Sequence, residues 1–299
     1  MTTPSVVWSP RYEVDIGGHV FPTRKYRLVR ERLLAQGVAP AGAFEEPEPM
    51  GDEALLRVHT ADYLRKIRED DFAPAERWRL EVPFSRALVE AMLLCCGGTL
   101  LAGRRALRDG VSAHLGGGFH HAFADHGEGF CLLNDVAAAA AALLADGSVR
   151  RVAVVDLDVH HGNGTAAIFA GDDRVLTFSM HQEDIYPAIK PPSNLDVALP
   201  ARIDDEAYLA LLAEHLPRAL AGRPDLVLYL AGADPYREDQ LGGLGLSQEG
   251  LRQRDRSVLE AARELGASVA AVLAGGYAMN TEDTVAIHAA TVEEVIRLG

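Results

Sequence analysis

The chain has 299 residues, of which 48% are hydrophobic and 24% charged, so it has ample material for a globular core. Its formal net charge of −14 argues against direct binding of nucleic acid, whose phosphates require a positive surface, but suits cationic partners such as lysine-rich peptides or polyamines. No run approaches the roughly 20 uninterrupted apolar residues of a membrane span, and the first residues lack the pattern of a signal peptide. Three cysteines, two of them adjacent, do not make a disulfide framework, so we expect a cytoplasmic location.

The first third of the chain is expected to be mainly helical. The elements predicted there, in chain order, are a strand at 5–8, a helix at 23–36, a loop rich in proline and glutamate at 39–49, a helix at 53–68, an irregular stretch at 70–83 and a helix at 85–108. Thr23 is expected to cap the first helix, because a hydroxyl before the first turn can accept a free backbone N–H.

From residue 111 onward the pattern alternates between apolar strands and helices. Strands are predicted at 111–115, 152–155, 174–180, 195–199, 225–231 and 268–273, and helices at 134–145, 165–170, 205–221, 247–265 and 281–298. Such alternation predicts an α/β fold with a mostly parallel sheet and helices on both faces. No repeat or linker divides the chain, so we expect a single domain over residues 1–299.

The strand at 152–155 leads into a group of metal-type ligands. A short run rich in valine is typical of a strand buried on both faces of a parallel sheet. Because side chains alternate along a strand, Asp156, Asp158 and His160 should project to one side where it ends. In open α/β sheets, this carboxyl edge is where ligands bind.

Three more strand ends carry reactive side chains beside glycine, namely the pair His120 and His121, then Asp234, then Tyr277. Asp158, His160 and Asp234 could supply three ligands to one divalent ion and leave a position open. One histidine with two carboxylates suits zinc, Fe(II) or Mn(II), so spacing alone does not choose the metal. The alternative is that these aspartates only cap turns and helices.

The histidine pair is suited to proton transfer near neutral pH, and Asp156 is available to orient one imidazole. Tyr277 could donate a hydrogen bond to an oxyanion, as donors do in acyl transfer. Taken singly, a histidine is more often structural than catalytic, and a tyrosine is more often a core residue. The functional interpretation therefore depends on these residues meeting at one site.

At these residues the sequence resembles the histone deacetylase family, and within it the bacterial proteins similar to its class IV branch. The motifs occur in the family's order and cover the chain from about residue 85 to the end. They are GGFHHA at 117–122, GFCLLND at 129–135, VDLDVHHGNG at 155–164, AGAD at 231–234 and GGY at 275–277. The run DQLGGL at 239–244 is the feature similar to class IV.

The resemblance implies the arginase/deacetylase fold, with a central sheet of eight strands and one catalytic zinc, for which Fe(II) is the alternative. The implied zinc ligands are Asp158, His160 and Asp234. The implied activity is that of a lysine deacetylase or deacylase, a hydrolase of linear amide C–N bonds that removes acetyl or longer fatty acyl groups from lysine side chains of proteins or peptides.

The resemblance also assigns the other roles at the site. His121 would be the general base toward a water that the metal activates, and His120, paired with Asp156, would protonate the leaving amine. Tyr277 would stabilise the oxyanion. The residues expected to line the acyl-lysine channel are Gly129, Phe130, Gly275 and, on the opposite wall, Tyr186.

A structural potassium or sodium ion is implied as well. Its ligands would be the carboxylate of Asp156, the carbonyls of Asp158, His160 and Met180, and the side chain of Ser179. A second, peripheral cation would use carbonyls near Phe169, Asp172 and Val175.

Asn163 stands where class I members of the family carry aspartate. A neutral amide stabilises an imidazolium less than a carboxylate does, so we expect Asn163 to tune the base His121. The acidic residue with which many members grip the substrate backbone has no match within residues 70–81.

Three other functions are compatible with parts of this pattern. The related arginase and agmatinase group holds two manganese ions with a second D-x-D motif, but Gly232 occupies the position two before Asp234, so one metal is favoured. An acetylpolyamine or other small-molecule amide deacetylase fits the acidic chain as well. A non-catalytic module that binds acyl-lysine is the remote alternative. The acyl chain length, the native metal and the oligomeric state stay open at this point.

Overall fold

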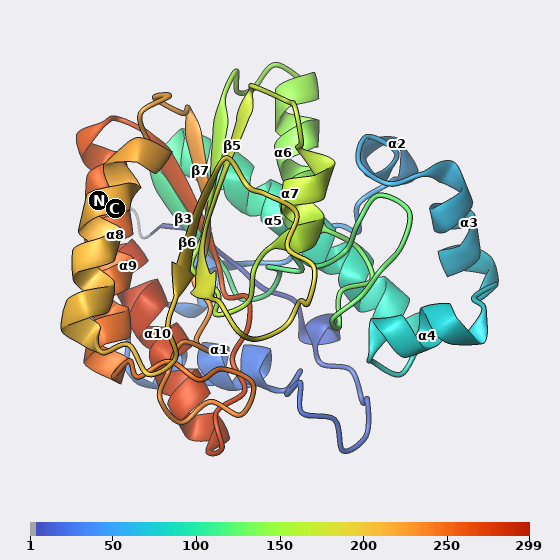
Figure 1. Cartoon of the computed structure of the whole chain (residues 1–299), viewed down its shortest axis with the longest axis horizontal. Coiled ribbons are helices and arrows are strands. Elements are labelled where there is room, and N and C mark those ends of the chain that lie inside the picture. The colour runs from blue at the N-terminus through green and yellow to red at the C-terminus, as the bar shows by residue number, and fades with distance from the viewer. Residues whose placement is uncertain (1–3) are drawn as a thin grey trace.

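The computed structural model describes residues 4–299, which fold around one eight-stranded sheet (Figure 1). The strands are β1 (Val6–Val7), β2 (Phe44–Glu45), β3 (Val111–His114), β4 (Val152–Asp156), β5 (Val175–Gln182), β6 (Leu195–Leu199), β7 (Leu226–Leu230) and β8 (Ser268–Val272). Their order across the sheet is β2-β1-β3-β8-β7-β4-β5-β6, and every pairing between them is parallel. The expected α/β fold is confirmed, and the sheet is wholly rather than mostly parallel.

Ten α-helices are present in residues 4–299. They are α1 (Lys25–Ala35), α2 (Asp52–Leu55), α3 (Ala61–Glu69), α4 (Pro74–Leu80), α5 (Arg86–Asp109), α6 (Asp135–Ala145), α7 (Asn163–Ile168), α8 (Asp205–Ala219), α9 (Gln248–Glu264) and α10 (Thr281–Leu298). In Figure 1, α5 and α6 lie on one side of the sheet and α8, α9 and α10 on the other.

Each face of the sheet packs into a separate apolar core. Val152 and Val154 of β4 belong to the core with α5 and α6, whereas Ala153 and Val155 belong to the core with α8, α9 and α10. All five residues of β4 and of β7 are buried. Central strands covered on both faces need apolar residues at every position, which is why they appear in the sequence as continuous apolar runs.

Helix α5 is long and apolar enough to cross a membrane by length and composition. Most of it is buried inside the fold, where it packs against α6 and against the neighbouring strands β3 and β8. Its hydrophobicity is therefore explained by its place in the core of the domain.

The predictions for the amino-terminal third were partly wrong. Strand β2 lies in the stretch predicted as a loop, because its pairing with β1 comes from a contact distant in sequence. The helix predicted at 53–68 is two helices, since Thr60 caps α3 by accepting from the Tyr63 N–H at 3.2 Å. Helix α4 occupies part of the stretch predicted as irregular, and it starts at Pro74.

Thr23 does not cap α1. Its hydroxyl donates to the Val14 carbonyl at 2.7 Å and accepts from the Val14 N–H at 3.2 Å, while the residue before α1 is Arg24, which makes no side-chain capping bond. The threonine closes the loop before the helix instead. By contrast, Asn134 caps α6 as predicted, with its side chain accepting from the Ala137 N–H at 2.9 Å.

Candidate active site

Asp158, His160 and Asp234 meet at the carboxyl edge of the sheet. The first two lie in the turn after β4, and Asp234 lies in the turn after the neighbouring β7. Their ligand atoms are all within 4.8 Å of one another, with His160 Nδ1 3.1 Å from Asp158 Oδ1 and 3.4 Å from Asp234 Oδ2. All three side chains are buried. The prediction that adjacent strand ends would gather these residues agrees with this geometry.

The buried side chains of Asp158, His160 and Asp234 form a site suited to a cation. Burial lowers the pKa of His160, but its contacts with Asp158 and Asp234 outweigh burial and raise that pKa to about 10. Burial and the charge of Asp158 raise the pKa of Asp234 to about 7. Among residues 4–299, Asp234 Oδ2 is buried without a hydrogen-bond partner. Two buried carboxylates and one imidazole are a donor set for zinc, Fe(II) or Mn(II), so the residues fit a divalent ion.

Gly275 is fixed by contact with these carboxylates. Its N–H donates to Asp158 Oδ2 at 2.8 Å, and a Cβ at this position would lie 2.5 Å from that oxygen and still closer to Asp234 Oδ2. Any side chain would displace the ligand pair, so the glycine lets the loop after β8 press directly on the site.

The two imidazoles of the loop after β3 form a chain of hydrogen bonds. His120 Nδ1 lies 2.7 Å from Asp156 Oδ2, His120 Nε2 lies 3.1 Å from His121 Nε2, and His121 Nδ1 lies 2.7 Å from Asn163 Oδ1. The pairing of His120 with Asp156 expected from the family is present. Asp135 supports the loop by accepting from the N–H groups of Gly118 and Phe119, at 3.0 and 2.7 Å.

The two imidazoles differ in charge near neutral pH. Burial lowers the pKa of His120, but the charge and hydrogen bond of Asp156 raise it to about 9. Burial and the neighbouring His120 charge lower the pKa of His121 well below its usual value. His120 can therefore donate a proton and the neutral His121 can accept one, which is the combination that acid–base chemistry needs.

A narrow pocket opens over this group, with a free volume of about 20 Å³. Its lining residues, which come from six segments, are Phe21, Tyr26, Gly117, Gly118, Phe119, His120, His121, Gly129, Phe130, Cys131, Asp158, His160, Ala274, Gly275 and Tyr277. Burial raises the pKa of Tyr277 well above its usual value, so its phenol keeps the proton that it can donate. Phe21 stacks on Phe130 with ring centroids 6.2 Å apart, a contact that the sequence did not reveal.

Tyr186 lies beside the pocket, and its role as the opposite wall of the channel stays a prediction. Its ring centroid is 4.9 Å from that of His121 and 6.3 Å from that of His160. Its hydroxyl donates to Glu128 Oε1 at 2.9 Å. Glu128 was not predicted, because only its neighbours Gly129 and Phe130 belong to a recognisable motif.

The residues expected to hold the first monovalent cation are neighbours. Asp156 and Ser179 are register partners in β4 and β5, and Met180 follows Ser179. For the second cation, the carbonyls of Phe169 and Asp172 already accept backbone N–H groups in the turn before β5, at 3.0 and 3.2 Å, the latter from Val175. Cation binding at either place stays a prediction.

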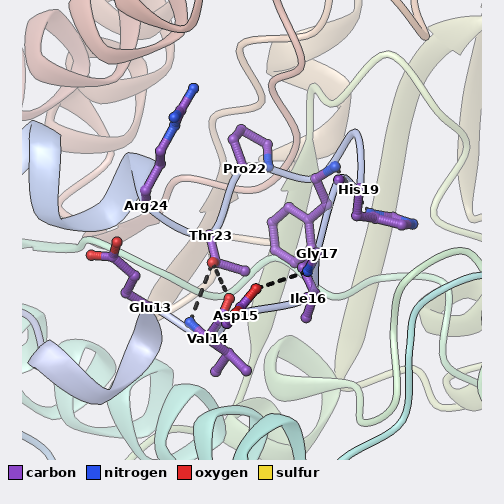
Figure 2. A pocket seen from close by; sticks show the side chains of 11 residues that line it. Glu13, Val14, Asp15, Ile16, Gly17, His19, Pro22, Thr23 and Arg24 are labelled. Atoms are coloured by element: carbon purple, nitrogen blue, oxygen red, sulfur yellow. Dashed lines mark hydrogen bonds between the residues drawn. The ribbon is translucent and has the colours of Figure 1, made fainter.

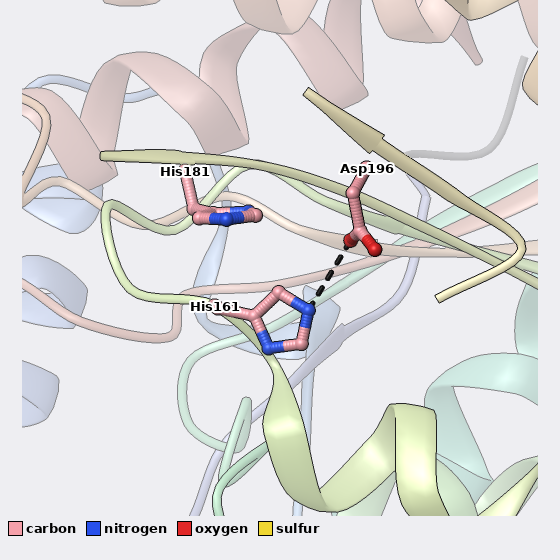
Figure 3. Close-up of side chains that lie close together, drawn as sticks. All are labelled: His161, His181 and Asp196. Atoms are coloured by element: carbon pink, nitrogen blue, oxygen red, sulfur yellow. Dashed lines mark hydrogen bonds and ion pairs between the residues drawn. The ribbon is translucent and has the colours of Figure 1, made fainter. Parts of the chain in front are cut away.

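A second group of metal-type side chains is formed by His161, His181 and Asp196 (Figure 3). His161 Nε2 is 3.2 Å from Asp196 Oδ1, and His181 packs edge-to-face on His161. An ion on Nε2 would force the proton onto His161 Nδ1, which is buried with no partner among the described residues. Metal-bound histidines normally donate that second N–H, so a hydrogen bond to Asp196 explains this group better.

A larger hollow of about 680 Å³ lies in the amino-terminal loop of residues 13–24 (Figure 2). The Thr23–Val14 hydrogen bonds draw the loop closed around it. The loop brings His19 against Phe130, with ring centroids 4.8 Å apart, so it supports the wall of the narrow pocket. The residues that line this hollow do not form a cluster comparable to that of Asp158, His160 and Asp234.

The histone deacetylase domain model matches residues 19–292. The chain belongs to the histone deacetylase family. It is 42% identical to an uncharacterized protein of Picosynechococcus, with 95% of each chain covered. It is 31% identical to the histone deacetylase-like amidohydrolase of Pseudomonas aeruginosa, covering 87% of this chain and 73% of the relative.

Other members of the family are similar along most of their length. Histone deacetylase 2 of Arabidopsis thaliana is 30% identical, with 94% of this chain and 76% of the relative covered. The crystal structure of the HDA15 HD domain superposes with a TM-score of 0.81 at 25% identity, over 97% of this chain and 88% of that one. These comparisons confirm the family and fold, and they identify the chain as a hydrolase of the deacetylase type.

Proposed function

We propose that the protein is a zinc-dependent deacylase that hydrolyses the amide of acyl-lysine side chains in proteins or peptides. The observation that carries the proposal is the meeting of three side-chain groups at one narrow pocket. These are the cation-binding group (Asp158, His160 and Asp234), the imidazole pair with His120 protonated and His121 neutral, and the phenol of Tyr277.

In this proposal each proton transfer is carried out by a different histidine. A zinc ion, when bound, polarises the acyl carbonyl and makes water more acidic. His121 accepts the proton of the attacking water at Nε2, because its Nδ1 is occupied by Asn163. His120, held by Asp156, gives a proton to the leaving amine, and Tyr277 donates a hydrogen bond to the developing oxyanion.

Acetyl is the acyl group that we propose. The free volume is only about 20 Å³, so the walls must move apart even for acetyl-lysine, and acetyl requires the smallest movement. The aromatic walls of Phe130 and Tyr186 suit the aliphatic stem of lysine, whereas a long fatty chain would require a much larger opening. The charge of −14 also supports an acetylpolyamine as a second candidate substrate.

The test compares hydrolysis of acetyl-lysine peptide, myristoyl-lysine peptide and acetylspermidine by the zinc-loaded protein. We expect release of acetate from the peptide, with Tyr277→Phe lowering kcat about 10²- to 10³-fold and leaving KM nearly unchanged. Tyr208→Phe is the matched control, because Tyr208 is buried in the other core and its hydroxyl has no partner within residues 4–299. Binding of the peptide without any hydrolysis would instead favour a non-catalytic module.

A further inference from the structure

Glu128 joins two residues that border the reactive group. Its Oε1 accepts from Asn163 Nδ2 at 2.5 Å and from the Tyr186 hydroxyl at 2.9 Å, and its Oε2 lies 3.6 Å from His126 Nε2. The side chain is only 16% exposed. Its own backbone carbonyl accepts from the Cys131 N–H at 2.9 Å, which fixes the turn that carries Phe130.

The contact with Glu128 decides which way the Asn163 amide faces. An ionised carboxylate only accepts hydrogen bonds, so the amide end that meets it must be the NH₂ group. Although burial raises the pKa of Glu128, its contact with His126 and its hydrogen bonds with Asn163 and Tyr186 outweigh burial and hold that pKa below its usual range, so the carboxylate is ionised at neutral pH. The amide oxygen of Asn163 must then face His121 Nδ1, 2.7 Å away.

The direction of the amide in turn decides the tautomer of His121. An oxygen facing Nδ1 requires the proton on Nδ1 and leaves the lone pair on Nε2, which is the nitrogen that points toward His120. A flipped amide would present NH₂ to Nδ1 and move the proton to Nε2, where it would block proton acceptance. Nothing in the amide itself prefers one direction, since its two ends have nearly the same shape.

We propose that Glu128 is a positioning residue that orients the Asn163 amide and thereby holds His121 in the tautomer with a free Nε2. The inference rests on the proposed function for its kinetic consequence, but not for the tautomer. A carboxylate in direct contact with His121 Nδ1 could hold this tautomer by itself. Here the amide of Asn163 lies between His121 and the carboxylate of Glu128, so Glu128 acts on His121 through Asn163.

Kinetics of three variants at pH 8 test the orientation. Glu128→Ala frees the amide, and we expect kcat for acetyl-lysine peptide to fall about 10- to 100-fold, the usual cost of losing such a supporting residue. Adding Asn163→Asp to Glu128→Ala should restore kcat to within a few-fold, because an aspartate offers an acceptor oxygen whichever way it turns. Asn163→Asp alone should give a lower kcat than the double variant, because the new carboxylate at position 163 would then contact the carboxylate of Glu128.

Two controls separate orientation from other roles. Glu81→Ala removes an acidic side chain whose charge interacts with that of Glu128 but which has no hydrogen bond to Asn163 among the described residues, so kcat should stay unchanged. Tyr186→Phe removes the other hydrogen bond to Glu128 but keeps the Asn163 contact. If Glu128 acted only through Tyr186 or through packing, Asn163→Asp would give no rescue of Glu128→Ala, and the proposal would be overturned.

A spectroscopic readout makes the result independent of the substrate. The ¹⁵N chemical shifts of the imidazole nitrogens in the zinc-loaded protein distinguish the two tautomers of His121. We expect Nδ1–H alone in the wild type and in the double variant, and a mixture in Glu128→Ala. A single Nδ1–H tautomer in Glu128→Ala would contradict the inference even in a fully active enzyme. An inactive wild type with the expected tautomers would refute only the proposed function.

Discussion

At the scale of single residues, the geometry around His121 makes its pKa sensitive to the group on Nδ1. Asn163 supplies a neutral oxygen there, and burial keeps the pKa of His121 well below its usual value. A base must be unprotonated to act, so activity is lost as the pH falls through this pKa. Raising the pKa therefore moves the acid limb of the pH–rate profile upward.

We predict that Asn163→Asp in the Glu128→Ala background moves the acid limb of kcat/KM upward by about one pH unit or more, because a carboxylate 2.7 Å from Nδ1 favours the imidazolium. The measurement is the pH dependence of kcat/KM for acetyl-lysine peptide. Asn163→Asp with Glu128 present should shift the limb in the same direction. A limb that stays in place in both variants would show that His121 is not the titrating base.

The predicted site residues that the structure brings together share one property. Asp158, His160, Asp234 and Tyr277 each follow a buried apolar strand, and parallel strands bring their carboxyl ends to one edge. Strand order could not be read from the sequence, and it is the observed order β3-β8-β7-β4 that makes these strand ends neighbours. Glu128, Phe21 and Asp135 were missed because loops that meet only in the folded chain create their contacts.

At the scale of elements, α9 carries two arrangements of charge. On its inner side the fully buried Arg254 donates to the carbonyls of Leu157, at 3.2 Å, and Gly232, at 2.6 Å. These carbonyls lie in the turns that carry Asp158 and Asp234, so α9 ties together the ends of β4 and β7. On its outer side α9 is bound to α10 through Glu294, which accepts from Arg252 and Arg256.

We predict that Glu294→Gln destabilises the fold by roughly 2 kcal/mol at pH 7. Glu294 is buried, and hydrogen bonds from Arg256, Arg297 and Arg252 outweigh burial and lower its pKa from 4.5 to about 2. Because the folded pKa is depressed, this stabilisation is present above about pH 4.5 and is lost as the pH falls toward 2. The loss should also reflect repulsion among the three arginines left without a carboxylate.

Urea unfolding of wild type and variant at pH 7 and pH 3.5 provides the measurement. The difference in unfolding free energy should shrink at the lower pH. Glu260→Gln is the matched control, since Glu260 is exposed and its one ion pair within residues 4–299 is with Arg297, so it should change stability by less than about 0.5 kcal/mol. Equal effects of the two substitutions would contradict the role given to Glu294.

The elements themselves were predictable to different degrees. Strands β4 and β7 could be recognised because burial on both faces leaves uninterrupted apolar runs. Strand β2 has two residues, both half-buried, and its pairing with β1 is not visible in a local pattern. The break between α2 and α3 depends on Thr60, whose cap competes with continuation of a single helix.

At the scale of the whole molecule, the fold concentrates buried negative charge at one point. The sheet brings two buried carboxylates together in the turns after β4 and β7, where their ion pairs are with the imidazole of His160 and, for Asp158, also with that of His120 at 3.8 Å. This arrangement costs stability unless a cation is bound. A divalent ion that binds the folded chain and not the unfolded one must therefore stabilise the entire domain.

We predict that saturating zinc raises Tm by roughly 8 to 12 °C relative to the chelator-treated protein. The estimate takes about 4 kcal/mol for free metal about a thousandfold above Kd, and about 2 to 3 °C per kcal/mol for a domain of this size. Asp234→Asn should abolish most of the shift in a thermal melt, because it removes a ligand whose Oδ2 has no hydrogen-bond partner in residues 4–299. Asp196→Asn, in the group of His161 and His181, should leave the shift intact. If Asp196→Asn abolished the shift and Asp234→Asn did not, the stabilising ion would lie at His161, His181 and Asp196. The claim that Asp158, His160 and Asp234 bind the ion would then be wrong.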